Sequence, residues 1–245
     1  FVTGVLASNE EMVAHMKIAG WRAPIYNVSG LSFGKAEVQG RVEAIKPFNQ
    51  RKDRIAFSAR WDQEKQPDFF MDIIEYWNTA PDMPAVEFAV LSGSKLKSNN
   101  DAYMARTREL QSKGWLTIYE DLEKNDYYNL LNDTKVLFNC ALQDWTSNTV
   151  SEADALGCNV VFPAYRSFPE TFGNDHTRLY IPWSREDAVI KLLWALGEDN
   201  VNQGKISDYT DGTIDRIVDI ITGQGEHLKR MDKDYRKHVR ESKYI

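Results

Sequence analysis

Cysteine and histidine are both scarce in this sequence, which contains two cysteines and four histidines among 245 residues. The histidines are scattered and no Cys/His cluster has the spacing of a zinc site, so we expect no bound metal. Cys140 and Cys158 each lie in or beside a segment with the composition of a buried strand. Free core thiols, which suit a reducing cytosol, are the simpler interpretation, and a disulfide is the alternative.

Long apolar runs are also absent. No stretch of about eighteen apolar residues occurs that would span a bilayer, and the first residues lack the basic and apolar regions of a signal peptide. The formal net charge of −6 offers no general attraction to nucleic acid or anionic lipid. We therefore expect a cytoplasmic protein without a membrane span, in which a polyanion partner would need a local basic patch.

From residue 54 onward, short β-type segments alternate with helical patterns, which is typical of a parallel sheet with helices on both faces. The expected strands are 54–60, 86–92, 116–119, 136–142, 159–165 and 178–183. The expected helices are 101–113, 125–132, 147–156, 186–196 and one that begins at Pro67. This pattern predicts a Rossmann-like α/β domain. The first of these strands is not followed by G-x-G-x-x-G, which argues against a dinucleotide oxidoreductase.

Residues 1–50 do not follow this rhythm. They contain a strand, a helix and a second strand, and then Gly30 and a polar stretch with few apolar residues. We interpret them as the tail of a preceding domain plus a linker, and 51–222 as the Rossmann-like domain. Two nearby glycines precede a charged helical segment, so 223–245 form a separate C-terminal helix. The chain opens at Phe1 in a segment of strand composition, and it therefore has the features of a fragment.

Two cations follow the first strand of the expected sheet. Arg60 stands at the strand end, and Lys65 comes five residues later, immediately before the helix that begins at Pro67. Ligands of open parallel sheets bind at this edge, beside helix N-termini that favour anions. Arg60 and Lys65 could hold a diphosphate and stabilise it as a leaving group. The alternative is that they are ordinary residues of a surface loop.

A second group of polar residues follows the expected strand 136–142. Asp144 lies at the strand end, and Glu152 lies eight residues later in the next helix. The start of that helix carries the small polar residues Thr146, Ser147, Asn148 and Thr149. A carboxylate can accept two hydrogen bonds from a vicinal diol, so this pattern suits ribose and hexose hydroxyls. Alternatively, Asp144 and Thr146 cap a helix and Glu152 is a surface residue.

Weaker features stand at the same edge. Gly93 follows the second strand, where it permits the close approach of a ligand or merely a tight turn. Pro169 and Glu170 follow the fifth strand. Three tryptophans near strand ends could stack on a base or sugar, or pack as partly buried side chains: Trp61, Trp145 and Trp183.

In order and spacing, residues 54–196 resemble the carboxyl-terminal domain of GT-B-fold glycosyltransferases, in the retaining group of sucrose-, mannosyl- and glycogen-synthase-like enzymes. Arg60 and Lys65 correspond to the family's Arg and Lys five residues apart. Asp144 and Glu152 correspond to its two glutamates separated by seven residues, and Gly30 to the usual glycine before the interdomain linker. The sequence departs from the family pattern at three positions, which carry Ala59 for Gly, Asp144 for Glu and Asn159 for Pro.

The resemblance implies transfer of a sugar from a UDP or GDP sugar to an acceptor hydroxyl with retention of configuration, without a further cofactor. It assigns Arg60 and Lys65 to the diphosphate, Asp144 to the donor sugar and Glu152 to the ribose, with N–H groups near Ser147 to Thr149 as fixed dipoles. The base would lie near Tyr119 to Leu122. In this family 51–222 would bind the nucleotide sugar, 1–50 would end an amino-terminal acceptor domain, and 223–245 would cross back to that domain.

The acceptor is not defined by the resemblance. The abundance of Asn, Asp, Lys and Tyr suggests a viral or phage enzyme, with a glycan or a hydroxymethylated DNA base as acceptor. Two alternatives to a transferase remain. One is a nucleotide-sugar-binding module without activity on its own, and the other is a nucleotide-sugar epimerase of the same fold, which needs no acceptor.

Overall fold

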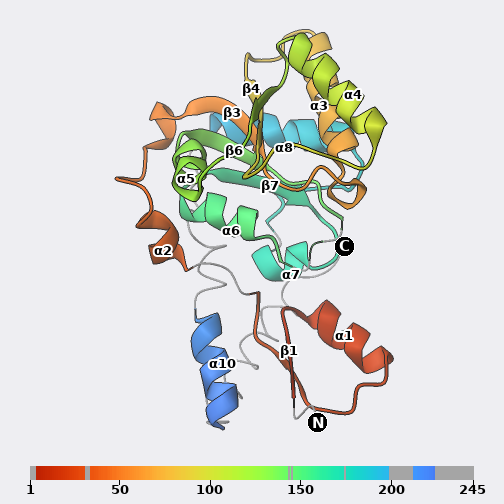
Figure 1. The fold of residues 1–245 in the computed structure, drawn as a ribbon, viewed down its shortest axis with the longest axis vertical. Coiled ribbons are helices and arrows are strands. Elements are labelled where there is room, and N and C mark those ends of the chain that lie inside the picture. The colour runs from red at the N-terminus through yellow and green to blue at the C-terminus, as the bar shows by residue number, and fades with distance from the viewer. Residues whose placement is uncertain are drawn as a thin grey trace.

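The computed structural model describes residues 4–30, 34–142, 144, 146–173, 175–198 and 212–223 (Figure 1). Its centre is a six-stranded sheet in the order β5-β4-β3-β6-β7-β8, in which every pair is parallel. The strands are β3 (Lys52–Phe57), β4 (Glu87–Leu91), β5 (Thr117–Tyr119), β6 (Thr134–Phe138), β7 (Asn159–Pro163) and β8 (Leu179–Tyr180). This sheet confirms the predicted Rossmann-like α/β fold. The strand order reverses between β3 and β6, which is where ligands of such sheets bind.

Helices connect the strands and cover both faces of the sheet (Figure 1). They are α3 (Pro67–Thr79), α4 (Asp101–Ser112), α5 (Lys124–Asn132), α6 (Asn148–Ala155), α7 (Phe168–Phe172) and α8 (Arg185–Gly197). Buried side chains of α3, α4 and α8 share one core cluster, and those of α5, α6 and α7 share the other. The sheet therefore lies between two apolar layers, as its nearly continuous apolar strands predict.

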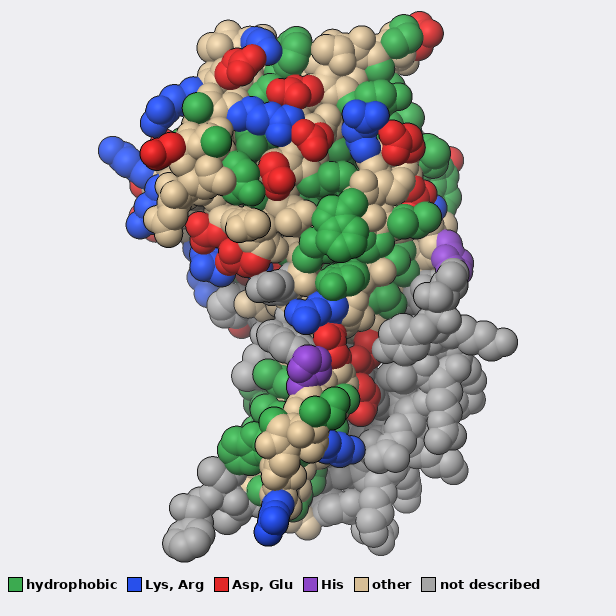
Figure 2. Space-filling model, turned by 90° about the vertical axis from the view of Figure 1, so that its right-hand side faces the viewer, with side chains coloured by type: hydrophobic (Ala, Val, Ile, Leu, Met, Phe, Trp, Pro, Cys, Tyr) green, Lys and Arg blue, Asp and Glu red, His purple; other side chains and the backbone are tan. Residues whose placement is uncertain are grey.

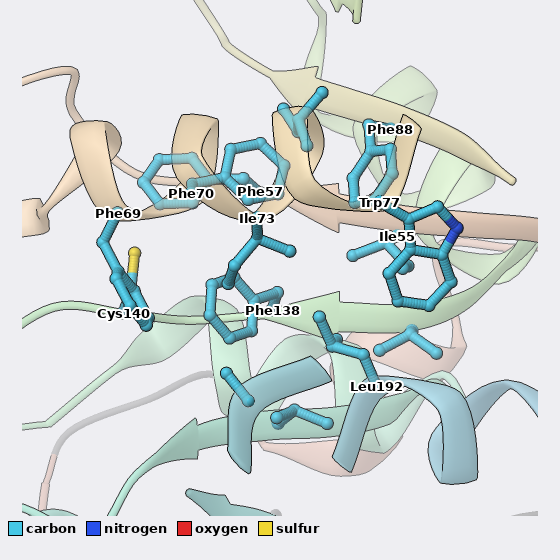
Figure 3. Packing of buried hydrophobic residues seen from close by; sticks show 14 of the residues in the cluster. Ile55, Phe57, Phe69, Phe70, Ile73, Trp77, Phe88, Phe138, Cys140 and Leu192 are labelled. Atoms are coloured by element: carbon cyan, nitrogen blue, oxygen red, sulfur yellow. The ribbon is translucent and has the colours of Figure 1, made fainter. Parts of the chain in front are cut away.

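The side chains of β3 divide between these two layers. Ile55 and Phe57 belong to the cluster with α3, and Ala56 belongs to the opposite one, because successive strand residues point to opposite faces. In the α3 layer, Phe70 stacks on Phe57 at 5.1 Å between ring centroids, and Trp77 packs nearby (Figure 3). The helical spacing read from the sequence thus corresponds to the buried face of α3.

The strands end earlier than the sequence pattern predicts. β3 stops at Phe57 and β6 at Phe138, so Arg60 and Asp144 lie in the loops that follow. The chain leaves the sheet after Phe57 because Trp61 turns into the core, where its indole is buried and donates to Thr107 Oγ1 at 2.9 Å. Trp61 therefore packs as a buried core residue, which is the second of the two roles considered for it.

Residues 4–30 form a smaller unit. β1 (Val5–Ala7) and β2 (Ile25–Asn27) make a parallel two-stranded sheet joined by α1 (Glu10–Ile18), and this unit lies beside α10 (Thr213–Thr222) below the main sheet (Figure 1). α2 (Lys35–Gln39) and a 3-10 helix (Phe48–Gln50) lead from it to β3. The expected charged helix 223–245 lies outside the described residues beyond Gly223.

The structure also bears on the predictions about the thiols, a membrane span and surface charge. Cys140 and Cys158 are both buried and free, as the simpler interpretation has it. Within the part of the chain that the structure describes, no helix has the length and apolar character needed to cross a bilayer. On the face shown in Figure 2, basic and acidic side chains intermingle over the main domain.

The linker after β2 lies against the loop before α6. A methyl group built on Gly30 would lie 1.9 Å from Thr146 Cγ2, and the carbonyl of Gly30 accepts a hydrogen bond from Thr213 Oγ1 at 3.3 Å. No side chain larger than hydrogen fits between these segments. Gly30 therefore permits the small unit and the main domain to approach closely, which is a steric requirement rather than a need for an unusual backbone angle.

We expect Gly30→Ala to lower the free energy of unfolding by about 1–3 kcal/mol, because the new methyl group would push the linker away from Thr146. Gly197→Ala is the matched control: no atom lies within 4 Å of its added methyl group, and alanine favours the helix. Chemical denaturation of both variants checks the prediction. Equal stability of the two would contradict it.

Candidate functional site

A cavity of about 860 Å³ opens at the carboxyl ends of β3 and β4. Its volume is within the range of small-molecule sites, and it lies beside the point where the strand order reverses. Three segments line it: the loop after β3, the loop after β4 and the first turn of α6. The lining residues are Ser58, Ala59, Arg60, Trp61, Asp62, Leu91, Ser92, Gly93, Ser94, Lys95, Leu96, Lys97, Ser98, Asn99 and Thr149.

Cations outnumber carboxylates in this lining. Arg60, Lys95 and Lys97 face a single acidic lining residue, Asp62. Arg60 is 70% exposed and forms ion pairs with Asp62, at 3.3 Å, and with Glu64. Exposed ion pairs are weak, so the Arg60 guanidinium can exchange these partners for an anion at small cost. The local excess of positive charge favours a phosphate-bearing ligand even though the chain as a whole is acidic.

Lys95 and Lys97 are not among the predicted site residues. They stand two residues apart in the Ser/Lys-rich segment 92–99. This composition is a signal of an anion-binding loop, and the sequence analysis did not use it. The backbone N–H of Leu96, between them, donates to Glu120 Oε1 at 2.7 Å. This hydrogen bond holds the loop against the turn after β5.

The start of α6 forms the opposite wall. Ser147 is buried at the N-cap position, where its hydroxyl accepts from Asn139 Nδ2 at 3.0 Å and lies 3.1 Å from Thr149 Oγ1. Thr149 lines the cavity, and Asn148 precedes it as the first helical residue. The unpaired N–H groups of this turn provide a positive dipole end beside the cations. Thr146 is directed at Gly30 and belongs to the contact described above.

Lys65 and Asp144 contact each other rather than the cavity. The Lys65 ammonium pairs with Asp144 Oδ1, and both side chains are largely buried, at 12% and 17% exposure. Cys140 Sγ donates to the backbone carbonyls of Lys65 and Gln66, which fixes the end of this loop. The structure thus brings together two residues that the sequence places in separate motifs, and neither of them is among the cavity-lining residues.

Glu152 lies one turn beyond Thr149 on α6 and is only 3% exposed. Its Oε1 accepts from Lys124 Nζ at 2.7 Å and from the Tyr128 hydroxyl at 3.1 Å, and both of these donors come from α5. The interpretation of Glu152 as a surface residue is therefore excluded. Lys124 and Tyr128 were not predicted, because nothing in the sequence pattern of α5 indicates which side chain they meet.

The turn after β5 lies against Gly93 through its backbone. The N–H of Ser92 donates to the carbonyl of Tyr119 at 2.9 Å, and the N–H of Leu122 donates to the carbonyl of Ser92 at 3.1 Å. The Tyr119 phenol instead donates to Glu87 Oε1 at 2.7 Å, near the start of β4. The segment from Tyr119 to Leu122 thus borders the cavity, while the Tyr119 ring is engaged elsewhere.

Trp183, another of the tryptophans near strand ends, lies differently from Trp61. Trp183 is exposed, and its indole N–H donates to Gln66 Oε1 at 3.1 Å. Trp145 lies outside the described residues. Within the described ranges, no group of three His, Cys, Asp or Glu side chains is placed to hold a metal ion.

Glu170 connects the main domain with the small unit. It is fully buried in α7, and its Oε1 accepts the N–H of Glu10 at 2.6 Å, at the start of α1. Burial, with the charge of Glu10 adding to it, raises the pKa of Glu170 to about 7 in spite of the backbone N–H groups that it accepts. The ionisation of this carboxyl group is therefore coupled to the contact between the two parts.

No family model and no curated protein matches this chain. Solved structures do match. TarM of S. aureus, in complex with fondaparinux, α-GlcNAc-glycerol and UDP, is 15% identical over 87% of this chain and 40% of its own, with a TM-score of 0.65. Sucrose-phosphate synthase of Thermosynechococcus elongatus is 12% identical over 96% of this chain and 58% of its own, with a TM-score of 0.62.

The pneumococcal O-GlcNAc transferase GtfA, in complex with UDP and GlcNAc, is 13% identical over 97% of this chain and 46% of its own, with a TM-score of 0.55. The chain thus spans less than two thirds of the length of these glycosyltransferases. At such identities the similarity establishes the fold, which is the Rossmann-like α/β fold of GT-B glycosyltransferases.

We expect the stability of the chain to fall between about pH 4.5 and pH 7 because of Glu170. Its pKa is higher in the folded protein than its ordinary value of 4.5, so the folded state binds the proton more tightly. This stabilisation is complete below pH 4.5 and is lost as the pH rises through 7, with a total on the order of 2–3 kcal/mol.

Glu170→Gln should remove this dependence, because an amide can accept the Glu10 N–H but does not titrate in this range. Denaturant unfolding of the parent and the variant at pH 5, 6, 7 and 8 measures the effect. The difference in unfolding free energy should move in favour of the variant as the pH rises. A constant difference across these four pH values would show that Glu170 does not titrate in this range.

Proposed function

We propose that this chain supplies the nucleotide-sugar-binding half of a GT-B glycosyltransferase, which moves a sugar from a nucleoside diphosphate sugar to an acceptor hydroxyl with retention. The observation that carries the proposal is the cationic cavity at the carboxyl ends of β3 and β4, with the start of α6 as its opposite wall. UDP is the first choice of nucleotide, because it is bound in the structures of TarM and GtfA.

The diphosphate would occupy the cavity. Arg60, Lys95 and Lys97 provide positive charge there, and the N–H groups near Thr149 provide dipoles that need no rearrangement. The chemical step leaves negative charge on the departing diphosphate, and donors fixed around that charge lower the barrier. Arg60 would leave Asp62 and Glu64 to reach the phosphates, whereas Lys65 would remain with Asp144.

The donor sugar would lie toward Asp144. The Lys65 ammonium holds this carboxylate in place, so that its remaining acceptor sites can receive sugar hydroxyls. Glu152, behind the same wall, would receive the ribose hydroxyls, and the base would lie along the segment from Tyr119 to Leu122. This assignment requires no covalent intermediate on the protein.

The acceptor side would be completed by a domain that begins before this chain. β1 and β2 are strands of three residues each, and a two-stranded sheet of that size is only marginally stable by itself. Leu6 and Tyr26 of these strands are exposed, as expected if further strands or helices belong beside them. A glycan or a hydroxymethylated DNA base remains the proposed class of acceptor.

The small size of the β1–β2 sheet favours a second candidate function. Without a larger acceptor domain, the chain by itself would be a nucleotide-sugar-binding module without transferase activity. Binding and turnover separate the two proposals, because the module binds a nucleotide sugar but produces neither a glycosylated product nor a free sugar.

We expect calorimetric titration with UDP, GDP, ADP and NAD, without added metal, to show saturable binding of one nucleoside diphosphate. Arg60→Ala should weaken that binding about five- to tenfold, since a charge-assisted contact is lost from an exposed site. Glu152→Ala should weaken nucleotide binding more than tenfold, because the variant loses the proposed contact with the ribose and also the ion pair with Lys124.

The matched control is His176→Ala, since His176 is exposed and lies outside the cavity lining, and its backbone carbonyl, which the substitution keeps, accepts from Lys191 Nζ. Unchanged affinity in this variant is expected. Absence of binding to all four nucleotides would remove the support for a donor site. Parent-like affinity of both Arg60→Ala and Glu152→Ala would show that the ligand binds elsewhere.

A further inference from the structure

The Glu152 carboxylate meets a cluster of side chains from the first two turns of α5. Lys124 Nζ lies 2.7 Å from Glu152 Oε1, and the Tyr128 hydroxyl lies 3.1 Å from the same oxygen. The Lys124 ammonium also lies 4.9 Å from the centroid of the Tyr127 ring and 4.7 Å from that of Tyr128. One cation is thus placed by a carboxylate and two aromatic faces, although its own side chain is half exposed.

This cluster lies directly behind the cavity wall. The hydroxyl of Ser58, a lining residue, donates to the Tyr127 hydroxyl at 3.5 Å. Thr149, another lining residue, precedes Glu152 by one turn on the same face of α6. Glu152 therefore lies behind Ser58 and Thr149, and α5 packs on its other side.

Burial makes these contacts important for Glu152. An ionised carboxylate with 3% exposure is costly unless it is paired and hydrogen-bonded. Burial, with the charge of Glu152 adding to it, raises the pKa of both tyrosine hydroxyls well above their ordinary value, so they remain proton donors. A carboxylate has about four acceptor sites, and Lys124 and Tyr128 occupy two on one oxygen. The Tyr127 hydroxyl also hydrogen-bonds this carboxylate, so acceptor capacity remains for about one further hydroxyl group.

The aromatic contacts restrict where the ammonium can be. A cation within about 6 Å of a ring centroid is attracted to its face, and the Lys124 ammonium lies within this distance of two rings. The direction of the carboxylate is then set by groups that a ligand does not displace. Such fixed orientation is what a hydrogen-bonding site needs in order to reject a ligand that lacks one hydroxyl.

We propose that Lys124 is a positioning residue that, with Tyr127 and Tyr128, orients Glu152 to accept ribose hydroxyls and so makes the site select ribonucleotides over deoxyribonucleotides. The proposal rests on the proposed function, since it takes the cavity as the nucleotide site. Lys124 acts through Glu152 and needs no contact with the ligand itself.

The test compares UDP with 2′-deoxy-UDP by calorimetry, using the full chain. The parent should bind UDP about tenfold more tightly, the value of one good hydrogen bond to a charged group. Lys124→Met removes the charge and keeps most of the length. It should weaken UDP binding five- to tenfold, leave 2′-deoxy-UDP binding nearly unchanged and so reduce the preference to about twofold or less. Lys124→Arg should restore part of the preference.

Lys135→Met is the matched control. Lys135 also combines an ion pair, with Asp53 at 2.6 Å, and an aromatic face, that of Phe48 at 5.1 Å, but it lies outside the cavity. Its affinities for both nucleotides should equal those of the parent. Adding Lys124→Met to Glu152→Gln should cause no further loss, because a residue that acts through Glu152 has nothing left to position.

The outcomes are distinct. Equal weakening of both nucleotides by Lys124→Met would mean a direct charge effect on the phosphates and would overturn the proposal. Tighter UDP binding would also overturn it, since Lys124 would then compete with the ribose. A parent that binds both nucleotides equally would exclude Glu152 as the ribose acceptor, and a parent that binds neither would refute the proposed function itself. If Lys124→Met does not fold, Tyr128→Phe tests the same loss of preference with the ring retained.

Discussion

The loop after β3 is anchored by one buried indole, and the arrangement of the cavity depends on it. Trp61 packs edge-on against Phe57 and Phe70, with ring centroids 5.3 and 6.5 Å apart, and donates a hydrogen bond to α4. The residue before it, Arg60, is thereby left at the cavity, and the chain after it turns back so that Lys65 meets Asp144. Packing of an apolar side chain thus separates two cations that stand only five residues apart.

The charged residues of the predicted donor site are each paired with a residue of opposite charge; they are Arg60, Lys65, Asp144 and Glu152. The exposure of each pair decides whether it can exchange its partner for a ligand. Arg60 is mostly exposed and so can exchange its carboxylates for a phosphate at little cost. The Lys65–Asp144 and Lys124–Glu152 pairs each contain a largely buried carboxylate, so losing the cation would be costly. The exposed Arg60 is therefore suited to contact a ligand, whereas the two buried carboxylates are suited to accept hydrogen bonds in a fixed orientation.

The cavity is also connected to the small unit. Gly30 lies against Thr146, which stands shortly before the N-terminus of α6, and Glu170 accepts a backbone hydrogen bond at the start of α1. Both contacts tie loops at the carboxyl edge of the main sheet to residues of the first thirty. A change in the contact between the small unit and the main domain would therefore alter the wall of the cavity.

The sequence by itself determined the α/β order, the Rossmann-like sheet and the loops that line the cavity. Helical and strand patterns depend on residues close together along the chain, so the segments that form β3 and α3 could be read directly. The loops that carry Arg60 and Gly93, and the helix start that carries Thr149, could also be assigned to one edge of the sheet, because parallel strands bring their carboxyl ends together there.

Only the tertiary structure decided which side chains meet at that edge. Lys65 and Asp144 are separated by 79 residues, and Lys124 and Glu152 by 28, so their contacts follow from the packing of whole elements and not from any local pattern. The same reason explains why Trp61 became core and why the Tyr119 phenol turned to Glu87. Local patterns specify what each segment forms, whereas the partners of its polar side chains depend on segments that are distant in the chain.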